Sequence, residues 1–365
     1  MRVFKWALWT LGGVAGAIAL CIVLLLGYRA LRQHENSDRY AIRGPRGVQE
    51  ARFVRLGGID QFVLIRGEDR RNPVVLMLHG GPGLAQSLLF PWFQPWERDF
   101  TVVQWDQRGA GNTYGRYGAK TPELNPSRMA QDGIELAEYL RHRLGTDRLI
   151  LLGHSWGSQL GLRMVAKRPD LFAAYVGTGQ AVDDAEAEKA GYDLVLSEAE
   201  KAGDTKALAA LRRVGPPPYR DSKAMLEERG AAAAFGPTSE QPGVYVARSG
   251  PTAFFAPGFS LRDFWNASAG GLYTLKALPP DKLNFRASTV ATSFGLPLFF
   301  IQGERDSVTP TSLVMRYMDR ISAPRKELVM LPGDGHGALL TDPDGFLQAM
   351  RAHVRPLVMQ AASPP

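Results

Sequence analysis

Short apolar runs and segments with helical spacing alternate along most of the chain. The runs that predict strands are residues 52–54, 61–65, 74–78, 100–105, 149–152, 171–176, 296–301 and 327–331. Gly57 and Gly58 separate the first two runs, which predicts a hairpin. Apolar spacing predicts a helix over 127–144, ending at Gly145, and a closing helix over 343–353. Strands that alternate with helices predict an α/β fold with a mostly parallel sheet covered on both faces.

The interval 181–290 does not follow this alternation. Asp183 and Glu186 have the spacing of a capping box, which predicts a helix that ends near Ala202. A shorter helix is predicted over 206–213, and aromatic residues become dense after it. We interpret this interval as a mostly helical cap inserted into the α/β core.

The N-terminal segment from Ala7 to Leu26 is apolar except for Thr10. It has about 20 residues, or roughly 30 Å as a helix, which is enough to cross a bilayer. A cleaved signal peptide, the alternative, has an apolar core of about 7–15 residues with small residues beyond it. Here the leucine-rich half continues past Ala17 and Ala19. We predict a retained single-pass anchor in a lipid bilayer, with basic residues on both sides that assign no orientation.

The domains predicted from these patterns follow the chain in order. They are a transmembrane anchor at 1–28, a basic tether at 29–46, the α/β core at 47–180 and 291–356, the cap at 181–290, and a tail at 357–365.

The net charge of +7 is concentrated near the anchor. The cluster just after the apolar run consists of Arg29, Arg32, Arg39, Arg43 and Arg46. Cations at that position commonly meet anionic lipid headgroups, so the charge does not indicate nucleic-acid binding. The only cysteine, Cys21, lies within the apolar run, so no disulfide can form within the chain.

Gly153-His154-Ser155-Trp156-Gly157 follows one of the predicted strands and precedes a helix-like stretch at 159–167. A strand, a sharp turn and a helix form the context in which G-x-S-x-G is typical of a nucleophile elbow. The alternative is a plain Gly-Ser turn. We predict that Ser155 is a catalytic nucleophile.

A serine nucleophile needs a histidine base, and His336 fits this role best. The other five histidines lie in the tether, in charged helices, at a strand end, or in the elbow facing away from its serine: His34, His142, His353, His79 and His154. Asp306 and Asp334 compete to orient His336. Asp334 is only two residues from the histidine, and the order Ser155, Asp306, His336 is that of a hydrolase triad, so we favour Asp306.

The reaction of a serine nucleophile also needs N–H donors for a developing oxyanion. The backbone of Trp156, directly after the nucleophile, should supply one. Gly81 should supply the other, because its glycine-rich loop lets the backbone approach a substrate closely. This chemistry uses no cofactor and no metal, and we expect neither.

Three segments together resemble the proline iminopeptidase branch of the α/β hydrolases. They are His79-Gly80-Gly81-Pro82-Gly83, Trp105-Asp106-Gln107-Arg108-Gly109-Ala110-Gly111 and Ser155-Trp156-Gly157-Ser158. The resemblance covers about 50–180 and 290–356. It implies an α/β-hydrolase core with a cap over the site, and removal of an N-terminal residue, often proline, from short peptides. Asp106 and Arg108 are expected to shape the wall of the site.

Members of that branch hold the substrate's free amine with acidic cap residues, within Trp-Glu and Glu-Asn-His-like stretches. This chain has neither stretch, and its candidates are Glu186, Glu188 and Asp193 on the first cap helix, where solvated surface charges are the alternative. Two other functions are open. One is an esterase or amidase for small apolar acyl substrates, and the other is a silent membrane-tethered binding protein, against which an intact triad argues.

Overall fold

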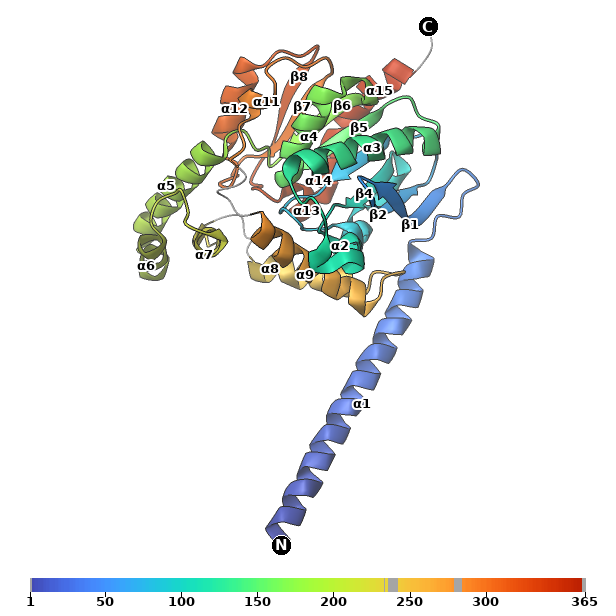
Figure 1. Ribbon diagram of the computed structural model, residues 1–365, viewed down its shortest axis with the longest axis vertical. Helices are drawn as coiled ribbons and strands as arrows, with labels where there is room; N and C mark the ends of the chain where they lie inside the picture. Colours follow the sequence, from blue (N-terminus) through green and yellow to red (C-terminus); the bar gives the residue numbers. More distant parts are fainter. Residues whose placement is uncertain (1, 233, 236–241, 279–283, 363–365) are drawn as a thin grey trace.

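A computed structural model describes residues 2–232, 234–235, 242–278 and 284–362 of the chain. In the part described, eight strands form one sheet in the order β1-β2-β4-β3-β5-β6-β7-β8 (Figure 1). The strands are β1 (Val48–Leu56), β2 (Ile59–Gly67), β3 (Val74–Leu78), β4 (Thr101–Asp106), β5 (Leu149–His154), β6 (Phe172–Thr178), β7 (Leu298–Gly303) and β8 (Lys326–Leu331). Strand β2 is antiparallel to both its neighbours, and the other pairs are parallel. The predicted mostly parallel α/β fold is confirmed.

Helices cover both faces of the sheet. On one face lie α3 (Pro126–Leu144), α4 (Trp156–Lys167) and α12 (Thr311–Arg320), and on the other lie the 3₁₀ segment η1 (Ser87–Arg98), α14 (Pro343–Ala349) and α15 (Arg355–Ala362). The predicted end of α3 is confirmed, because Gly145 ends the helix in the left-handed conformation. At its start, which no pattern in the sequence located, the Asn125 side chain accepts a hydrogen bond from Arg128 N at 2.9 Å. Shorter elements are α2 (Gly111–Tyr117), η2 (Gly118–Lys120), η3 (Pro169–Leu171), α11 (Ala287–Val290), α13 (Ala338–Thr341) and the π-helical η5 (Met350–Val354).

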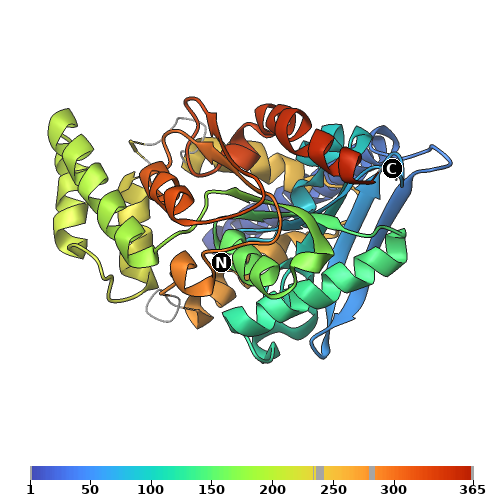
Figure 2. The same cartoon turned by 90° about the horizontal axis from the view of Figure 1, so that it is seen from above.

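Five cap helices lie between β6 and β7 in the described part of the sequence. They are α5 (Asp184–Ala202), α6 (Thr205–Val214), α7 (Ser222–Ala232), α8 (Pro242–Phe254) and α9 (Leu261–Ala277). Asp183 is the N-cap of α5, and its side chain accepts from Glu186 N at 3.1 Å, which explains the spacing seen in the sequence. Figure 2 shows the yellow-green helices α5 to α7 standing clear of the sheet at one end of the molecule. Their own small core includes Tyr192, Val195 and Leu211.

Helix α1 (Arg2–Arg39) projects far from the globular part of the molecule (Figure 1). Its apolar stretch has a mean hydropathy of 2.3, and none of it is buried within the chain. Among the described residues it is the one helix long and apolar enough to cross a membrane, a criterion that an N-terminal signal sequence also meets.

Residues 29–39, the first part of the predicted tether at 29–46, are helical and contact the cap. The helix continues to Arg39, and its last turns bind the final residue of α8 and the loop between α8 and α9. The contacts are Arg29 Nε to Phe254 O (3.0 Å), Arg29 Nη2 to Phe259 O (2.8 Å), Gln33 Nε2 to Ala256 O (2.7 Å) and Asn36 Nδ2 to Phe255 O (3.1 Å). These polar side chains donate hydrogen bonds to backbone carbonyl groups. The polarity of a residue in the sequence does not show whether its side chain will face water or make such a bond.

Candidate active site

Ser155 lies in the sharp turn between β5 and α4, with φ 54° and ψ −119°. A positive φ is strained for a residue with a side chain, and close packing around the turn holds it there. A Cβ atom at Gly157 would come within 2.0 Å of Leu78 O, and one at Gly153 would lie 2.7 Å from Gly157 O. Only glycine fits at these two positions, which is why the G-x-S-x-G pattern accompanies this turn.

The turn places Ser155 beside His336. Nε2 of His336 lies 2.9 Å from Oγ of Ser155, and Nδ1 lies 3.1 Å from Oδ2 and 3.2 Å from Oδ1 of Asp306. The side chain of Asp306 is buried. The three groups thus form a continuous hydrogen-bonded line, an arrangement that can move the Ser155 proton to His336 while a carboxylate stabilises the resulting imidazolium.

Asp306 is held as an ionised group. Burial disfavours its charge, but His336 and hydrogen bonds from Thr309 outweigh this effect and keep the pKa of Asp306 below its usual range. The donors are Val308 N (2.9 Å), Thr309 N (2.8 Å), Thr309 Oγ1 (2.7 Å) and Gln302 Nε2 (2.8 Å). Asp334, the competing carboxylate, has its backbone oxygen bound by Arg305 N at 2.7 Å, and burial raises the pKa of its side chain. Of the two, Asp306 is the one placed to orient His336.

His154 contributes a contact that the sequence did not predict. It was expected to face away from the site, yet its Nε2–H donates to the backbone oxygen of His336 at 3.0 Å, and the two rings lie 5.3 Å apart. Burial lowers the pKa of His154 to about 4, so it is a neutral donor at neutral pH. It fixes the position of the His336 loop. Along a strand, His154 and Ser155 would point to opposite faces of the sheet. The sharp turn at Ser155 ends this alternation, so the strand pattern does not fix the direction of Ser155 relative to His154.

A second buried histidine, His79, lies at the end of β3. Its Nδ1–H donates to Gly80 O at 2.9 Å, and its Nε2 accepts from Gln107 N at 3.3 Å. Burial lowers the pKa of His79 from 6.5 to about 4. Between these two values the unfolded chain binds more protons than the folded protein, so the stability that His79 contributes is present above about pH 6.5 and is lost as the pH falls toward 4.

This difference predicts an acid sensitivity. From about pH 7 to about pH 5, the wild type should lose about 2 kcal/mol of unfolding free energy through His79, and His79→Gln should not show that part of the loss. Denaturant unfolding of both proteins at the two pH values measures the difference between them. A difference that does not change with pH would contradict the prediction.

The predicted oxyanion donors lie at the same place as Ser155. Gly81, Ser155 and Trp156 line one cavity of about 110 Å³. Gly81 has φ 120°, and a Cβ atom there would lie 2.6 Å from Gly83 N, so the loop requires glycine at this position. Trp156 begins α4, where backbone N–H groups have no acceptor within the helix.

The three acidic cap candidates separate in the structure. Glu188 lines the cavity beside Ser155. Glu186 is exposed and pairs with Arg316 at 2.5 Å, and Asp193 is exposed and pairs with Lys189 at 2.6 Å. Those two are therefore corrected to surface ion pairs. At 100° per residue, Glu186 and Glu188 point about 200° apart around α5, so they cannot both face the cavity.

Asp184 was not predicted, and it lines the same cavity. Its carboxylate accepts from Gln159 Nε2 at 3.0 Å and from Phe285 N at 2.9 Å, and burial raises its pKa to about 6. Asp184 lies four residues before Glu188, one helical turn, so the two acids share a face of α5. The four-residue spacing was visible in the sequence, but the inward direction of that face was not.

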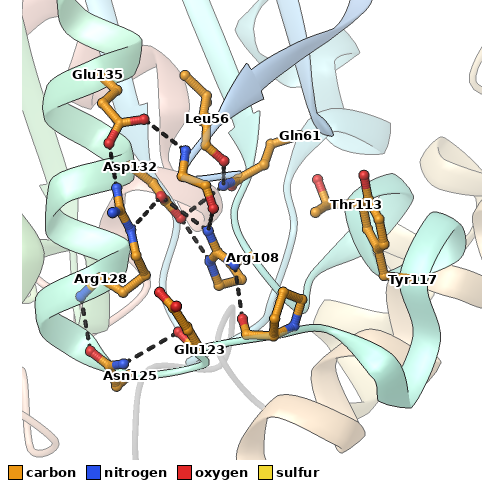
Figure 3. Close-up of polar contacts among 12 residues, drawn as sticks. Leu56, Gln61, Arg108, Thr113, Tyr117, Glu123, Asn125, Arg128, Asp132 and Glu135 are labelled. Atoms are coloured by element: carbon orange, nitrogen blue, oxygen red, sulfur yellow. Dashed lines mark hydrogen bonds and ion pairs between the residues drawn. The ribbon is translucent and has the colours of Figure 1, made fainter. Parts of the chain in front are cut away.

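Asp106 and Arg108, expected to shape the wall of the site, are fully buried and do not line the cavity that contains Ser155. Arg108 is fully buried, and Figure 3 shows its guanidinium bound to Asp132 of α3. Its Nε and Nη2 lie 2.8 and 3.1 Å from the Asp132 oxygens, and Nη2 also donates to Gly57 O at 2.8 Å. Arg108 thereby ties the loop after β4 to α3 and to the β1–β2 hairpin.

Comparison with known proteins agrees with this architecture. A family model described as the alpha/beta hydrolase fold matches residues 73–343. The chain is 29% identical over 308 residues to the "Probable aminopeptidase YbaC" of Bacillus subtilis, covering 82% of this chain and 94% of that protein. It is 38% identical over 116 residues to a "Probable proline iminopeptidase" of Streptomyces coelicolor, covering 32% of this chain and 35% of that protein.

Two solved structures share the fold. A proline iminopeptidase-related protein from Thermus thermophilus aligns with a TM-score of 0.54 at 22% identity, covering 85% of this chain and 99% of that one. A membrane phospholipase A, described as a bacterial virulence factor, aligns with a TM-score of 0.59 at 17% identity, covering 98% of this chain and 99% of that one. Since the family model spans most of the sequence, the chain belongs to the α/β-hydrolase family, with named relatives among the aminopeptidases and proline iminopeptidases.

Proposed function

We propose that the chain is a membrane-anchored serine aminopeptidase that removes a small N-terminal residue, such as proline, from short peptides. One observation carries this proposal: Ser155, hydrogen-bonded to His336 and through it to Asp306, lines a cavity that is also lined by the cap carboxylates Asp184 and Glu188. A nucleophile and two carboxylates in one small cavity, which Arg229 also lines, suit a substrate whose reacting carbonyl lies close to a free amine.

The proposed reaction passes through an acyl-enzyme. Nε2 of His336 takes the proton of Ser155 as Oγ attacks the carbonyl carbon of the N-terminal residue. The backbone N–H groups of Gly81 and Trp156 stabilise the oxyanion of the tetrahedral intermediate. His336 then gives the proton to the leaving amine as the peptide C–N bond breaks. Water, deprotonated by His336, releases the bound residue and restores Ser155, while Asp306 holds the imidazole in the required tautomer.

The acids of the cavity supply the proposed selectivity. A substrate ammonium that enters this cavity loses water, and an unpaired buried charge costs several kcal/mol. Burial also raises the pKa of Glu188, against the effect of the nearby Arg229, and a bound ammonium would offset the cost of its ionisation. The cavity of about 110 Å³ is far below the 300–1,000 Å³ typical of sites for drug-sized ligands, which favours one small residue over a long acyl chain.

Turnover of proline arylamide by the full-length protein, compared with its N-acetylated form, tests this function. Rapid cleavage of the free-amine substrate supports an aminopeptidase. Equal rates with and without the amine, or faster cleavage of a simple ester, would support an esterase instead.

The anchor can be tested separately. Full-length protein should stay with membranes through high-salt and carbonate washes, because about 20 apolar residues of α1 would lie in the hydrocarbon core. Protein that lacks residues 1–27 retains Arg29 and its contacts with the cap, and it should be released into the soluble fraction. Recovery of full-length protein in the carbonate supernatant, or a mature N-terminus beyond residue 27, would instead indicate a cleaved signal peptide.

A further inference from the structure

Helix α9 presents an apolar face to the outside of the molecule. Leu261 is 43% exposed, and Trp265 and Leu272 are each 70% exposed. At 100° per residue, these three side chains lie within about 40° of one another around the helix. Exposed Arg262 and Lys276 flank them. Large apolar residues that cluster on one surface commonly mark an interaction site, whereas isolated ones do not.

The opposite face of α9 is fixed against the proposed active site. Thr274 Oγ1 donates to Gly109 O at 2.8 Å, and a Cβ atom at Gly83 would lie 2.7 Å from Thr274 Cβ. Near the end of the helix, Leu275, which borders the outer face, and Leu278 line the cavity that contains Ser155. The helix therefore cannot turn to bury its outer face without breaking these contacts.

The start of α9 lies where α1 enters the globular part. Arg29 and Gln33 both bind Phe259 O, two residues before α9 begins. The apolar run of α1 ends at Leu26, three residues before Arg29, which is about 4.5 Å along a helix. Figure 1 shows α8 and α9 on the side of the globular part from which α1 projects.

A groove at the same junction combines apolar and cationic side chains, as the outer face of α9 does. It has a volume of about 680 Å³ and lies between the end of α1, the β1–β2 hairpin and the start of α9. Aromatic side chains and arginines line it together, among them Tyr40, Phe53, Phe259, Arg116 and Arg262. Apolar rings beside cations suit the mixed chemistry of a phospholipid surface.

We propose that the outer face of α9 lies in the interface of the same bilayer that α1 spans. Tryptophan favours the headgroup level, leucines insert below it, and flanking cations attract anionic lipid, which is the pattern of an interfacial helix. The proposal rests on the proposed anchoring by α1. It implies that the catalytic domain lies on the membrane with the α9 side of the cap facing the bilayer. The proposed substrates are then peptides at the bilayer surface.

Site-directed spin labelling of the full-length protein tests this orientation. The protein is reconstituted into vesicles of phosphatidylcholine and phosphatidylglycerol, and a nitroxide is attached to one cysteine at a time. Accessibility to oxygen, which concentrates in lipid, is compared with accessibility to a water-soluble nickel complex. The native Cys21 reports on α1, while Trp265→Cys and Leu272→Cys, each made in a Cys21→Ala background, report on α9. Met315→Cys on α12, in the same Cys21→Ala background, is the matched control away from α1, and Met315 is 53% exposed.

Each outcome has a distinct meaning. We expect high oxygen and low nickel accessibility at 21, 265 and 272, and the reverse at 315. High nickel accessibility at 265 and 272 with lipid-like values at 21 would overturn the orientation and leave the anchor intact. High nickel accessibility at 21 would overturn the anchor itself. Low accessibility to both reagents at 265 and 272 would assign this face to a second copy of the chain and would also overturn the proposal.

Discussion

Ser155→Ala should lower kcat by about 10⁴-fold or more, and His336→Ala should lower it by nearly the same factor. The two side chains lie 2.9 Å apart, and the proposed attack requires both, since the serine is a poor nucleophile without the base. Removing either one therefore removes the same step, and the double variant should lose little more than each single one. Single-turnover cleavage of proline arylamide measures this, with a fluorophosphonate probe to report on Ser155 directly.

The carboxylate assignment gives this prediction its control. Asp306→Asn should lower kcat severely, because the amide cannot hold the His336 tautomer or stabilise the charge on His336 as the carboxylate does. Asp334→Asn changes an acid in the His336 loop that was not placed to orient His336, and the kcat of this variant should stay close to that of the wild type. A more severe loss in Asp334→Asn than in Asp306→Asn would overturn the assignment. A fully active Ser155→Ala protein would overturn the proposed mechanism.

The second large effect concerns the free amine of the substrate. Proline arylamide should be cleaved at least about a hundredfold faster than its N-acetyl form, which corresponds to roughly 2.7 kcal/mol of transition-state binding. Glu188→Gln should remove most of this preference, because the neutral amide no longer pairs with an ammonium in the cavity. Comparison of kcat/KM for the two substrates in each variant measures the effect.

Glu186→Gln is the matched control for this experiment. It neutralises the same residue type on the same helix, but Glu186 pairs with Arg316 on the surface, so the preference should remain. Asp184→Asn should lower the preference as well, and also stability, because Asp184 binds Gln159 and Phe285 N. Loss of the preference in Glu186→Gln but not in Glu188→Gln would contradict the placement of these acids.

Local patterns predicted the features that depend on neighbours in the sequence. The hairpin at Gly57 and Gly58, the helix ended by Gly145, and the turn at Ser155 are each set by a few adjacent residues, and the structure has all three. The choice between Asp306 and Asp334 also follows from chain geometry, since a side chain two residues away cannot easily reach Nδ1 of His336, the nitrogen that Asp306 contacts.

The features that could not be predicted depend on contacts between distant segments. Arg29 is more than two hundred positions from the carbonyl groups it binds, and no local pattern shows that a polar turn of α1 will meet them. The same holds for His154, whose acceptor is the backbone of His336. On α5 the angular spacing of the acids follows from the sequence, but which face turns inward is decided by how the cap packs.

The unbroken course of α1 has a geometric consequence. Helix α1 runs from Arg2 to Arg39 without a hinge, so its residues act as a rigid spacer between the apolar run and the cap. In a bilayer-spanning α1, each residue inserted after Leu26 would raise the catalytic domain by about 1.5 Å, with no slack to absorb the change. Five or six insertions would exceed most of the roughly 5–10 Å depth at which interfacial helices lie. With α1 across a bilayer, the length of this segment would fix the distance between the catalytic domain and the membrane surface.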